Sequence, residues 1–360
     1  MSFVFTSFLE QALSGKTFSI EETTEIFEAI LAGEVSAIQL ASFLTVLRMR
    51  TETVEELEGA VRAMRHYMIP VNKFDPTTID VCGTGGDGKS TLNISTAVSF
   101  VLAALGVSVA KHGNRAQSSQ SGGTDVLAAL GIDPQSDLKI LQSNLNQFKI
   151  TFLSAFVHHP SLNHINKIRK DLAIRTIFNL LGPLCNPANV AYHLIGVYDP
   201  FWLTPFVRVL KELGSKRAWV VHGFVDELCS SSGVDEITLS GPSKIMVLEK
   251  NKIFPIRLTS KTIEKVGLNL SPLSAIRGGS PKENAEAILA LLRGKKNVYR
   301  DTVLINAAIA LHIVKDYSLV NLQGEIDSHI LKKLISQAAY AIDSGAALSV
   351  LNNVKNSIVN

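Results

Sequence analysis

Hydrophobic residues recur at helical spacing through the first 70 positions of the chain. The segments that begin after Ser19, Ser36 and Thr53 carry apolar residues three and four positions apart, which is the spacing of one buried helix face. Serine and threonine are preferred residues at the position just before a helix. No alternating strand pattern interrupts these segments, and Pro70 ends the run. The pattern predicts an N-terminal helical region.

The hydrophobic pattern changes at Thr78. Residues 78–82 predict a strand, the segment that starts near Asn93 predicts a helix, and residues 106–110 predict a second strand. A strand, loop, helix and strand in succession are typical of a parallel α/β layer. Apolar segments predict more strands and then two late helices, namely 150–153, 193–197, 218–221, 288–292 and 304–313.

These elements predict an α/β fold: a small helical domain plus a larger α/β domain with a mainly parallel central sheet flanked by helices. We expect the helical domain to span residues 1–72. The polar, helical stretch of about residues 162–190 is expected to join it. The catalytic α/β domain is then expected over residues 73–161 and 191–360. A length of 360 residues agrees with two domains of ordinary size.

Composition narrows the class of protein. Hydrophobic residues make up 46% of the chain and charged residues 19%, which favours a well-buried core over disorder. A net charge of +3 gives little reason to expect nucleic acid as a partner. The three cysteines, Cys82, Cys185 and Cys229, lie far apart and match neither a zinc site nor a disulfide framework. With no signal peptide and no apolar run long enough for a membrane span, the sequence predicts a cytoplasmic protein.

A glycine-rich loop, Gly83-Thr84-Gly85-Gly86-Asp87, follows the predicted strand at 78–82. Closely spaced glycines let main-chain N–H groups approach a phosphate, and a following helix N-terminus adds partial positive charge. An ordinary strand-to-helix turn is the alternative interpretation. Residues 83–90, GTGGDGKS, also fit the Walker A pattern of P-loop NTPases. Against that assignment, the predicted helix does not open at Lys89, and Asp87 is unsuited to cradling a bare phosphate.

Two further polar clusters lie near this loop. Asn93, Ser95 and Thr96 stand at a predicted helix start, where they act either as caps or as ligands for phosphate and Mg²⁺. Residues 111–115, KHGNR, follow directly on a predicted strand, where open α/β sheets place their ligand crevice. There Lys111 supplies positive charge, while His112 and Asn114 supply directional hydrogen bonds. A solvated surface loop is the alternative.

Four segments, in this order and at these separations, resemble anthranilate phosphoribosyltransferases: DVCGTGGDGKSTLNISTA, AKHGNRAQSSQSGGTDVLAALG, IRKDLAIRTIFNLLGPLCNP and GVDEITLSGPSKI. The resemblance extends over nearly the whole chain. It implies transfer of the 5-phosphoribosyl group from phosphoribosyl pyrophosphate (PRPP) to anthranilate, giving N-(5-phosphoribosyl)anthranilate and pyrophosphate, in tryptophan biosynthesis. It also implies two Mg²⁺ ions per subunit and a homodimer formed through the helical domain.

The chemistry implied by the resemblance needs no strong base, because the anthranilate amine is already neutral near pH 7. Catalysis is then positioning and electrostatic stabilisation, with no catalytic residue in the strict sense. The resemblance places PRPP at Gly83, Gly86, Asp87, Thr91, Asn93, Ile94, Ser95, Thr96, Lys111, Asn114, Ser118, Ser119 and Gly123. It places anthranilate at Gly83, His112, Asn114, His159 and Arg169. It places the metal at Ser95, Asp235 and Glu236.

The acidic pair has a competitor in Asp226-Glu227, because this chain carries extra residues after Gly223. The downstream sequence ITLSGPS favours Asp235-Glu236.

Three positions depart from the family pattern. Gly123 stands where the family usually has serine, and Thr124 stands where it has alanine, so Ser121 or Thr124 is a candidate to supply the missing hydroxyl. Phe156 replaces a proline expected in the substrate channel, where it would alter the shape near anthranilate.

Two rival functions share the fold. Pyrimidine nucleoside phosphorylases have a similar glycine loop, but KHGNR and RTIFNLLGPL favour the transferase. A nucleic-acid-binding paralogue would need a basic surface, which the net charge of +3 does not suggest.

Overall fold

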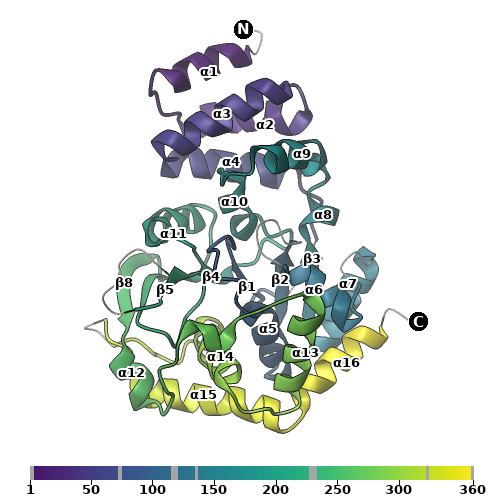
Figure 1. Cartoon of the computed structure of the whole chain (residues 1–360), viewed down its shortest axis with the longest axis vertical. Coiled ribbons are helices and arrows are strands. Elements are labelled where there is room, and N and C mark those ends of the chain that lie inside the picture. Colours follow the sequence, from purple (N-terminus) through teal and green to yellow (C-terminus); the bar gives the residue numbers. More distant parts are fainter. Residues whose placement is uncertain are drawn as a thin grey trace.

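The computed structural model describes residues 4–71, 75–114, 121–133, 137–226, 233–321 and 324–357. Four helices, α1 (Phe5–Leu13), α2 (Ile20–Ala32), α3 (Ala37–Arg50) and α4 (Val54–Tyr67), form a bundle at one end of the molecule (Figure 1). Ser19, Ser36 and Thr53 each accept a hydrogen bond from the third helical residue and form a capping box. The three predicted helix starts are therefore confirmed.

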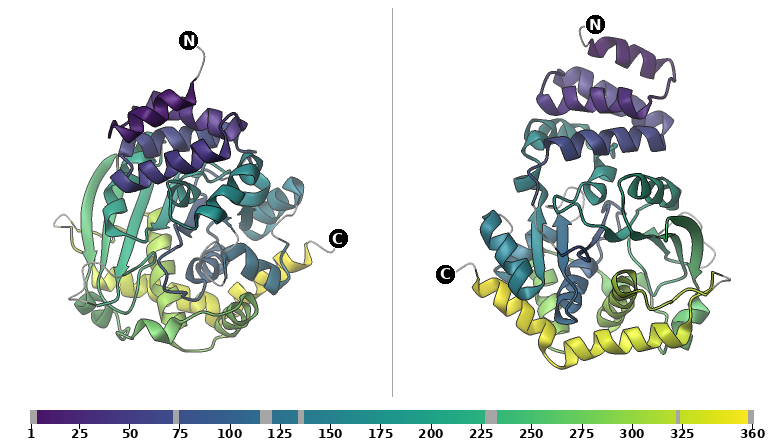
Figure 2. Two further views of the ribbon diagram at one scale, coloured as in Figure 1. Left: turned by 45° about the horizontal axis from the view of Figure 1, so that its top comes forward. Right: turned by 180° about the vertical axis from the view of Figure 1, so that it is seen from behind.

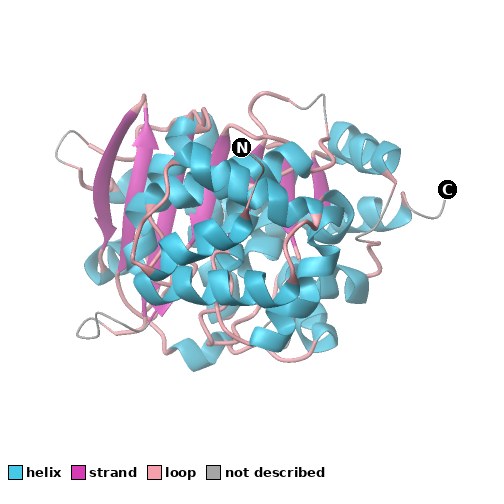
Figure 3. Ribbon diagram, turned by 90° about the horizontal axis from the view of Figure 1, so that it is seen from above, coloured by secondary structure: helices cyan, strands magenta, loops and turns pink. Residues whose placement is uncertain are grey.

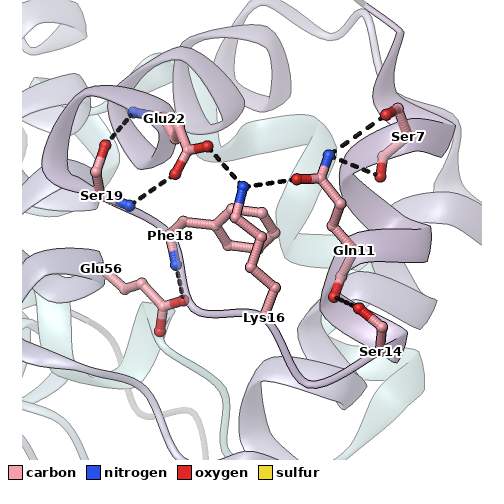
Figure 4. Close-up of polar contacts among 8 residues, drawn as sticks. All are labelled: Ser7, Gln11, Ser14, Lys16, Phe18, Ser19, Glu22 and Glu56. Carbon is pink, nitrogen blue, oxygen red and sulfur yellow. Dashed lines mark hydrogen bonds and ion pairs between the residues drawn. The ribbon is translucent and has the colours of Figure 1, made fainter.

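Polar contacts join the turns of this bundle (Figure 4). The Nζ atom of Lys16 donates to Glu22 Oε1 at 2.8 Å, beside the capping box of α2. The main-chain N–H of Phe18 donates to Glu56 Oε1 at 3.0 Å, which ties the segment before α2 to α4. Glu56 is fully buried, and it also pairs with Arg50. Because each of its oxygens has a partner, the buried carboxylate stabilises the bundle.

The larger part of the chain is built on one eight-stranded sheet. Its strands are β1 (Ile79–Gly83), β2 (Val109–Gly113), β3 (Ile150–Ser154), β4 (Tyr192–Gly196), β5 (Arg217–Phe224), β6 (Gly233–Val234), β7 (Ser243–Glu249) and β8 (Lys252–Leu258). The order is β3-β2-β1-β4-β5-β7-β8, and β6 pairs with β5. The first five strands are parallel, whereas β6, β7 and β8 pair antiparallel. Seen from above, helices overlie the middle of the sheet, while the strands at the left of the view stay uncovered (Figure 3).

Helices cover both faces of the sheet. One face shares a core with α5 (Ile94–Ala104), α6 (Gly123–Leu130), α12 (Ser260–Lys265), α13 (Pro281–Leu292), α14 (Val298–Lys315), α15 (Ser328–Asp343) and α16 (Ala346–Asn356). The other face packs on α11 (Leu203–Glu212), in a core that continues into the helical bundle. Helix α7 (Leu138–Phe148) packs against the edge strand β3, and α15 and α16 run along the base (Figure 2). The predicted fold class, an α/β fold with helices flanking a mainly parallel sheet, is confirmed.

A third stretch lies between the bundle and the sheet. It contains α8 (Ala155–His158), α9 (Asn163–Leu172) and α10 (Phe178–Leu181) (Figure 1). Ile165, Phe178 and Leu181 are buried in the same core as α2, α3 and α4. Two main-chain hydrogen bonds join the segment after α4 to the chain on either side of α9 and α10. Ile69 N donates to His158 O at 2.8 Å, and Val71 N donates to Pro187 O at 3.0 Å.

The structure corrects the expected position of one strand. β2 begins at Val109 and runs to Gly113, whereas the sequence pattern indicated 106–110. Parallel pairing with β3, from Val109 opposite Ile150 to Gly113 opposite Ser154, extends the strand through Lys111 and His112. These two residues therefore lie within the strand rather than after it. Their side chains consequently leave opposite faces of the sheet.

Within the described residues, no single helix is both long and apolar enough to cross a membrane. The α15 and α16 pair, bent by 54°, meets the length and composition criteria only when both helices are taken together.

Candidate active site

A cavity of about 270 Å³ lies between the carboxyl ends of the central strands and the α8–α10 stretch. Open α/β sheets place ligand crevices at this edge. Every sequence-predicted site residue within the described ranges lines it: Gly83, Gly86, Asp87, Thr91, Asn93, Ile94, Ser95, Thr96, Lys111, His112, Asn114, Gly123, His159, Arg169, Asp235 and Glu236. Ser118 and Ser119 lie outside the described residues.

The structure separates the two candidate acidic pairs. Asp235 and Glu236 line the cavity, and the main-chain N–H of Gly85 donates to Asp235 Oδ2 at 2.7 Å. Asp226 is not among the lining residues, and Glu227 lies outside the described ranges. The glycine loop and the Asp235-Glu236 pair therefore form one continuous wall.

Glycines at the strand ends make room for the acidic pair. A Cβ atom on Gly83 would collide with the Asp235 carboxylate, and one on Gly196 would collide with the Asp235 carbonyl. A Cβ atom on Gly223 would collide with the Glu236 carbonyl. Gly83 and Gly196 are register partners on β1 and β4. The acidic segment is thus pressed against the edge of the sheet, at a distance that only glycine permits.

Burial shifts the acid–base properties of these carboxyls. Loss of solvent and the nearby Asp87 raise the pKa of Asp235 to about 7. Burial and the adjacent Asp235 raise the pKa of Glu236 well above its ordinary range, although Lys111 and the main-chain N–H of Ser95 oppose that shift. Asp87 Oδ2 is buried and has no hydrogen-bond partner among the described residues. Three crowded carboxyls with one nearby cation fit the binding of a hard divalent cation.

No set of three or more His, Cys, Asp or Glu side chains within the described ranges is arranged to hold a metal ion unaided. Mg²⁺ is commonly bound through one or two carboxylates together with substrate phosphates and water. The acidic pair agrees with that mode of binding.

Lys111 projects from β2 toward the glycine loop and α5. It is buried, and its Nζ atom donates to Val81 O at 2.7 Å and to Ser95 Oγ at 3.1 Å. These bonds hold an ammonium group beside the N-terminus of α5, where positive charge gathers. We call the set of Gly83–Asp87, Asn93–Thr96, Lys111 and Asp235-Glu236 the phosphate side of the cavity.

His112 projects the other way, toward residues 155–185. Its Nδ1 atom lies 2.9 Å from Gly182 O, and His159 Nε2 lies 3.1 Å from Cys185 O. Because a carbonyl can only accept, these two nitrogens carry the ring protons. Burial lowers the pKa of His159 to about 4 and that of His112 well below its ordinary value. Both rings are therefore neutral near pH 7, with acceptor nitrogens that have no partner among the described residues.

Arg169 supplies the cation of this second wall. It comes from α9, and its guanidinium lies 5.5 Å from the centre of the Phe178 ring on α10. Burial lowers the pKa of Arg169 to about 10, so it stays charged at neutral pH. The sequence pattern alone would place it on the surface of a helix. We call His112, His159, Arg169 and Phe178 the helical side of the cavity.

Residues far along the chain brace the phosphate side, and no sequence motif indicated them. Asn284 Nδ2 donates to Asn93 Oδ1 at 2.9 Å, and the Tyr299 hydroxyl donates to Asn93 O at 3.0 Å. Asn93 makes no side-chain cap hydrogen bond to α5, so capping does not explain its side chain. Gly278 N donates to Ser90 O at 2.7 Å. Further lining residues that no sequence pattern indicated include Met64, Ser90, Leu162, Asn179 and Gly182.

The P-loop alternative does not fit the geometry. Helix α5 begins at Ile94, well after Lys89, and Lys89 is not among the residues that line the cavity. Gly85 and Gly86 adopt positive φ values of 65° and 74°, which shape the loop around Asp235.

The three departures from the family pattern, Gly123, Thr124 and Phe156, fall in different places. Ser121 and Gly123 line the main cavity, while Thr124 lines a small neighbouring cavity with Lys111 and Ser154. Ser121 is therefore the better placed of the two candidate hydroxyls. Phe156 is 53% exposed and does not line the cavity, although its neighbour Ala155 does. The expectation that Phe156 reshapes the substrate channel is wrong, because its ring turns to solvent.

Comparison with known proteins agrees with this architecture. Residues 6–68 match the glycosyl transferase family helical bundle domain, and residues 75–348 match the glycosyl transferase family a/b domain. The anthranilate phosphoribosyltransferase of Gluconobacter oxydans is 49% identical over 98% of this chain and 95% of its own. The structure of the Thermus thermophilus enzyme of that name has a TM-score of 0.86 and 35% identity, covering 98% and 99% of the two chains. The Saccharomyces cerevisiae enzyme in complex with PRPP and Mg has a TM-score of 0.84 and 28% identity, covering 99% and 98%.

Proposed function

The chain belongs to the anthranilate phosphoribosyltransferase family, and from that premise we propose which residues of the cavity hold each substrate. The enzyme transfers the phosphoribosyl group of PRPP to anthranilate in tryptophan synthesis. One observation carries the assignment: all the described residues that the family resemblance selects line a single cavity. The phosphate side and the helical side differ in charge, so they suit different substrates.

We assign PRPP to the phosphate side. Main-chain N–H groups of the glycine loop, the N-terminus of α5 and the ammonium of Lys111 are all suited to bind phosphate oxygens. Asn93, Ser95 and Thr96 add short polar side chains, and Thr96 Oγ1 is buried with no partner among the described residues. The other cavity-lining residues that we assign to PRPP are Gly86, Asp87, Thr91, Ile94, Asn114 and Gly123. Ser118 and Ser119 are proposed from the resemblance alone.

Asp235, Glu236 and Ser95 are the proposed ligands of Mg²⁺, with two ions per subunit. The bound cations would neutralise the pyrophosphate as it leaves. Support comes from the crowded carboxyls and from the unpaired Asp87 Oδ2, because a cation would relieve both. The Saccharomyces relative is described in complex with PRPP and Mg, which agrees with a shared site. Titration of the protein with Mn²⁺ in the presence of PRPP measures the number of ions.

Anthranilate is assigned to the helical side, together with Gly83 and Asn114. Arg169 is the proposed partner of its carboxylate, because a guanidinium can donate two parallel hydrogen bonds to that group. The neutral rings of His112 and His159 offer acceptor nitrogens for an amine. Because neither ring is charged, neither repels the ribose carbon as positive charge grows on it.

The residues suggest a division of work in the reaction. The amine attacks the ribose carbon as the bond to pyrophosphate breaks, and the amine proton leaves afterwards. Lys111 and the loop N–H groups stabilise the negative charge that gathers on the leaving group. The helical side holds the amine on the opposite side of the ribose, which supplies orientation rather than acid–base chemistry.

The assay mixes protein, anthranilate, PRPP and Mg²⁺ and follows the loss of anthranilate fluorescence. Activity without Mg²⁺, or with PRPP replaced by ribose 1-phosphate, would contradict the proposed use of the phosphate side.

A homodimer is proposed through the outer surface of the helical bundle. Ile38 and Met49 are 81% and 82% exposed, and they lie on the same face of α3. Leu13 on α1 is also exposed. Exposed apolar residues grouped in this way commonly mark contact surfaces. Sedimentation analysis of the protein and of an Ile38→Glu, Met49→Glu variant tests this contact, and an unchanged mass would rule it out.

We also propose that residues 162–190 belong to the helical domain, because α9 packs against α3 and α10 packs against α4. A cytoplasmic location is proposed from the free, buried thiols of Cys82 and Cys185, which are typical of reducing compartments.

A further inference from the structure

Asn306 is a polar residue in the middle of the apolar helix α14. Its side chain is completely buried, and its neighbours Ile305 and Ala307 belong to the hydrophobic core. Placing an amide in such a core is unfavourable unless hydrogen bonds replace those made with water. The amide must therefore have partners that justify its position.

Those partners lie in the acidic segment of the cavity wall. The main-chain N–H of Ile237 donates to Asn306 Oδ1 at 3.2 Å, and Asn306 Nδ2 donates to Ile237 O at 2.8 Å. The second Nδ2 proton goes to Thr302 O of the same helix at 2.9 Å. Ile237 lies between β6 and β7 and belongs to neither strand. The carboxamide thus supplies both hydrogen bonds that a neighbouring strand would otherwise make.

Ile237 directly follows Asp235 and Glu236. The main chain of these two residues rests on Gly196 and Gly223 at the edge of the sheet. Asn306 holds the next residue from the opposite direction, through α14. The main chain that carries the two carboxylates is therefore fixed on both sides. Their direction into the cavity depends on both supports.

We propose that Asn306 is a positioning residue for the magnesium site, acting through Ile237 on the direction of the Asp235 and Glu236 carboxylates. This inference rests on the proposed metal-binding role of that pair. Asparagine is suited to the task because its amide donates and accepts at once. Leucine has a similar size but can do neither. Partners of metal ligands commonly change metal affinity by about 10–100-fold when they are removed.

The test compares Asn306→Leu with Thr302→Val. Thr302 is buried one turn earlier in α14, and among the described residues its hydroxyl bonds only to Val298 O within that helix. Mn²⁺ binding is measured by electron paramagnetic resonance with pyrophosphate present, and amide hydrogen exchange is followed over residues 235–238. We expect N306L to weaken Mn²⁺ binding about 10–100-fold and to speed exchange at Ile237, with the anthranilate KM unchanged. T302V should alter neither Mn²⁺ affinity nor exchange at Ile237.

Equal Mn²⁺ affinity in N306L and T302V would overturn the proposal. So would a rise in the anthranilate KM as large as the loss of Mn²⁺ affinity, because that would indicate general damage. If N306L does not fold, Asn306→Ser replaces it, since its hydroxyl is too short to bridge both main-chain groups of Ile237.

An Asp235→Asn, Glu236→Gln variant is measured alongside. If it binds Mn²⁺ normally, the proposed metal site is wrong. If it alone loses Mn²⁺ binding, only the role of Asn306 is wrong.

Discussion

The phosphate side and the helical side of the cavity satisfy their polar groups in different ways. On the phosphate side, carboxyls and an ammonium are crowded together, and the buried Asp87 Oδ2 has no hydrogen-bond partner in the part of the chain that the structure describes. On the helical side, each imidazole is fixed by a main-chain carbonyl and stays neutral, and Arg169 rests near the Phe178 ring. On the first side, the crowded carboxyls repel one another, and a bound cation would offset that repulsion. Among the described residues, the second side has no such crowding of like charges, and its two unpartnered imidazole nitrogens leave it to provide shape and orientation.

The largest effect is expected from removing the negative charge of the phosphate side. Asp235→Asn with Glu236→Gln should lower turnover by roughly 1,000-fold or more, since several kcal/mol of charge stabilisation depend on the metal. The melting temperature should not fall, because the change removes two buried carboxyls that repel each other and whose pKa values are raised for that reason. The measurement is the anthranilate fluorescence assay together with thermal unfolding. Asp226→Asn is the control, because Asp226 does not line the cavity, and a comparable loss there would reverse the choice of pair.

A smaller effect is expected from moving the acidic pair without removing it. Gly83→Ala places a methyl group against the Asp235 carboxylate, so the pair must shift. A displacement of about 1 Å in such a site can cost about 100-fold in rate. Gly113→Ala is the matched change at the end of the neighbouring strand β2, where the nearest atom of the described residues, Thr124 Oγ1, would lie 3.9 Å from the added Cβ. Steady-state kinetics should show a much smaller loss in G113A than in G83A, and equal losses would show that closeness to Asp235 is not the cause.

On the helical side, a loss in anthranilate binding alone is expected. Arg169→Gln removes a charge-assisted contact worth about 1.5–3 kcal/mol, so the anthranilate KM should rise about 10–100-fold. The PRPP KM should stay nearly constant, because Arg169 lies on the other wall. Measuring both constants in one series separates the two sides. An equal rise in both would break the distinction between them.

The smallest expected effect concerns how folding stability depends on pH: Asp235 on the phosphate side and His159 on the helical side should change it in opposite directions. Asp235 has an ordinary pKa of 3.8, raised to about 7 in the folded chain. Between these values the folded chain keeps a proton that the unfolded chain loses, so stability falls as pH rises. His159 has an ordinary pKa of 6.5, lowered to about 4. Between those values the unfolded chain binds the extra proton, so stability rises with pH.

Thermal unfolding from pH 4 to 8 in EDTA checks these signs. Asp235→Asn should remove the fall in stability as the pH rises toward 7. His159→Gln should remove the rise in stability as the pH rises toward 6.5. Identical profiles for wild type and both variants would show that neither group controls stability. Over pH 6–8 the anthranilate KM should change little, because both imidazoles stay neutral.

The parts of the fold that sequence could predict are those whose signals are local. The capping residues Ser19, Ser36 and Thr53 and the glycine loop each act within a few positions, and the helix starts were predicted correctly. The β7–β8 hairpin was missed. Its turn uses Lys250 and Asn251 at positive φ instead of a glycine pair, and Pro255 lies within β8. Proline is tolerated there because β8 is an edge strand.

The residues that support the cavity wall from distant parts of the chain could not be predicted, for a different reason. Asn284, Tyr299 and Asn306 contact residues 69 to 206 positions away in the sequence. An asparagine in an amphipathic or apolar helix has no periodic signature that distinguishes a partner from solvent. The downstream sequence ITLSGPS favours Asp235 over Asp226, but the hydrogen bond between Asp235 and Gly85 is a matter of three-dimensional packing that no local pattern indicates.

The alternation of Lys111 and His112 along β2 has a consequence for how specificity can change. A rise of about 3.3 Å along the strand separates Lys111, the residue proposed to face PRPP, from His112, the residue proposed to face anthranilate. Substitutions at His112 or in α8–α10 can therefore redesign acceptor choice while the contacts of Lys111 with Val81 and Ser95 persist. An insertion of one residue in β2 would exchange the two directions and ruin both at once. Substitutions in β2 can therefore change the specificity for one substrate at a time, whereas a change in the length of the strand would disturb both.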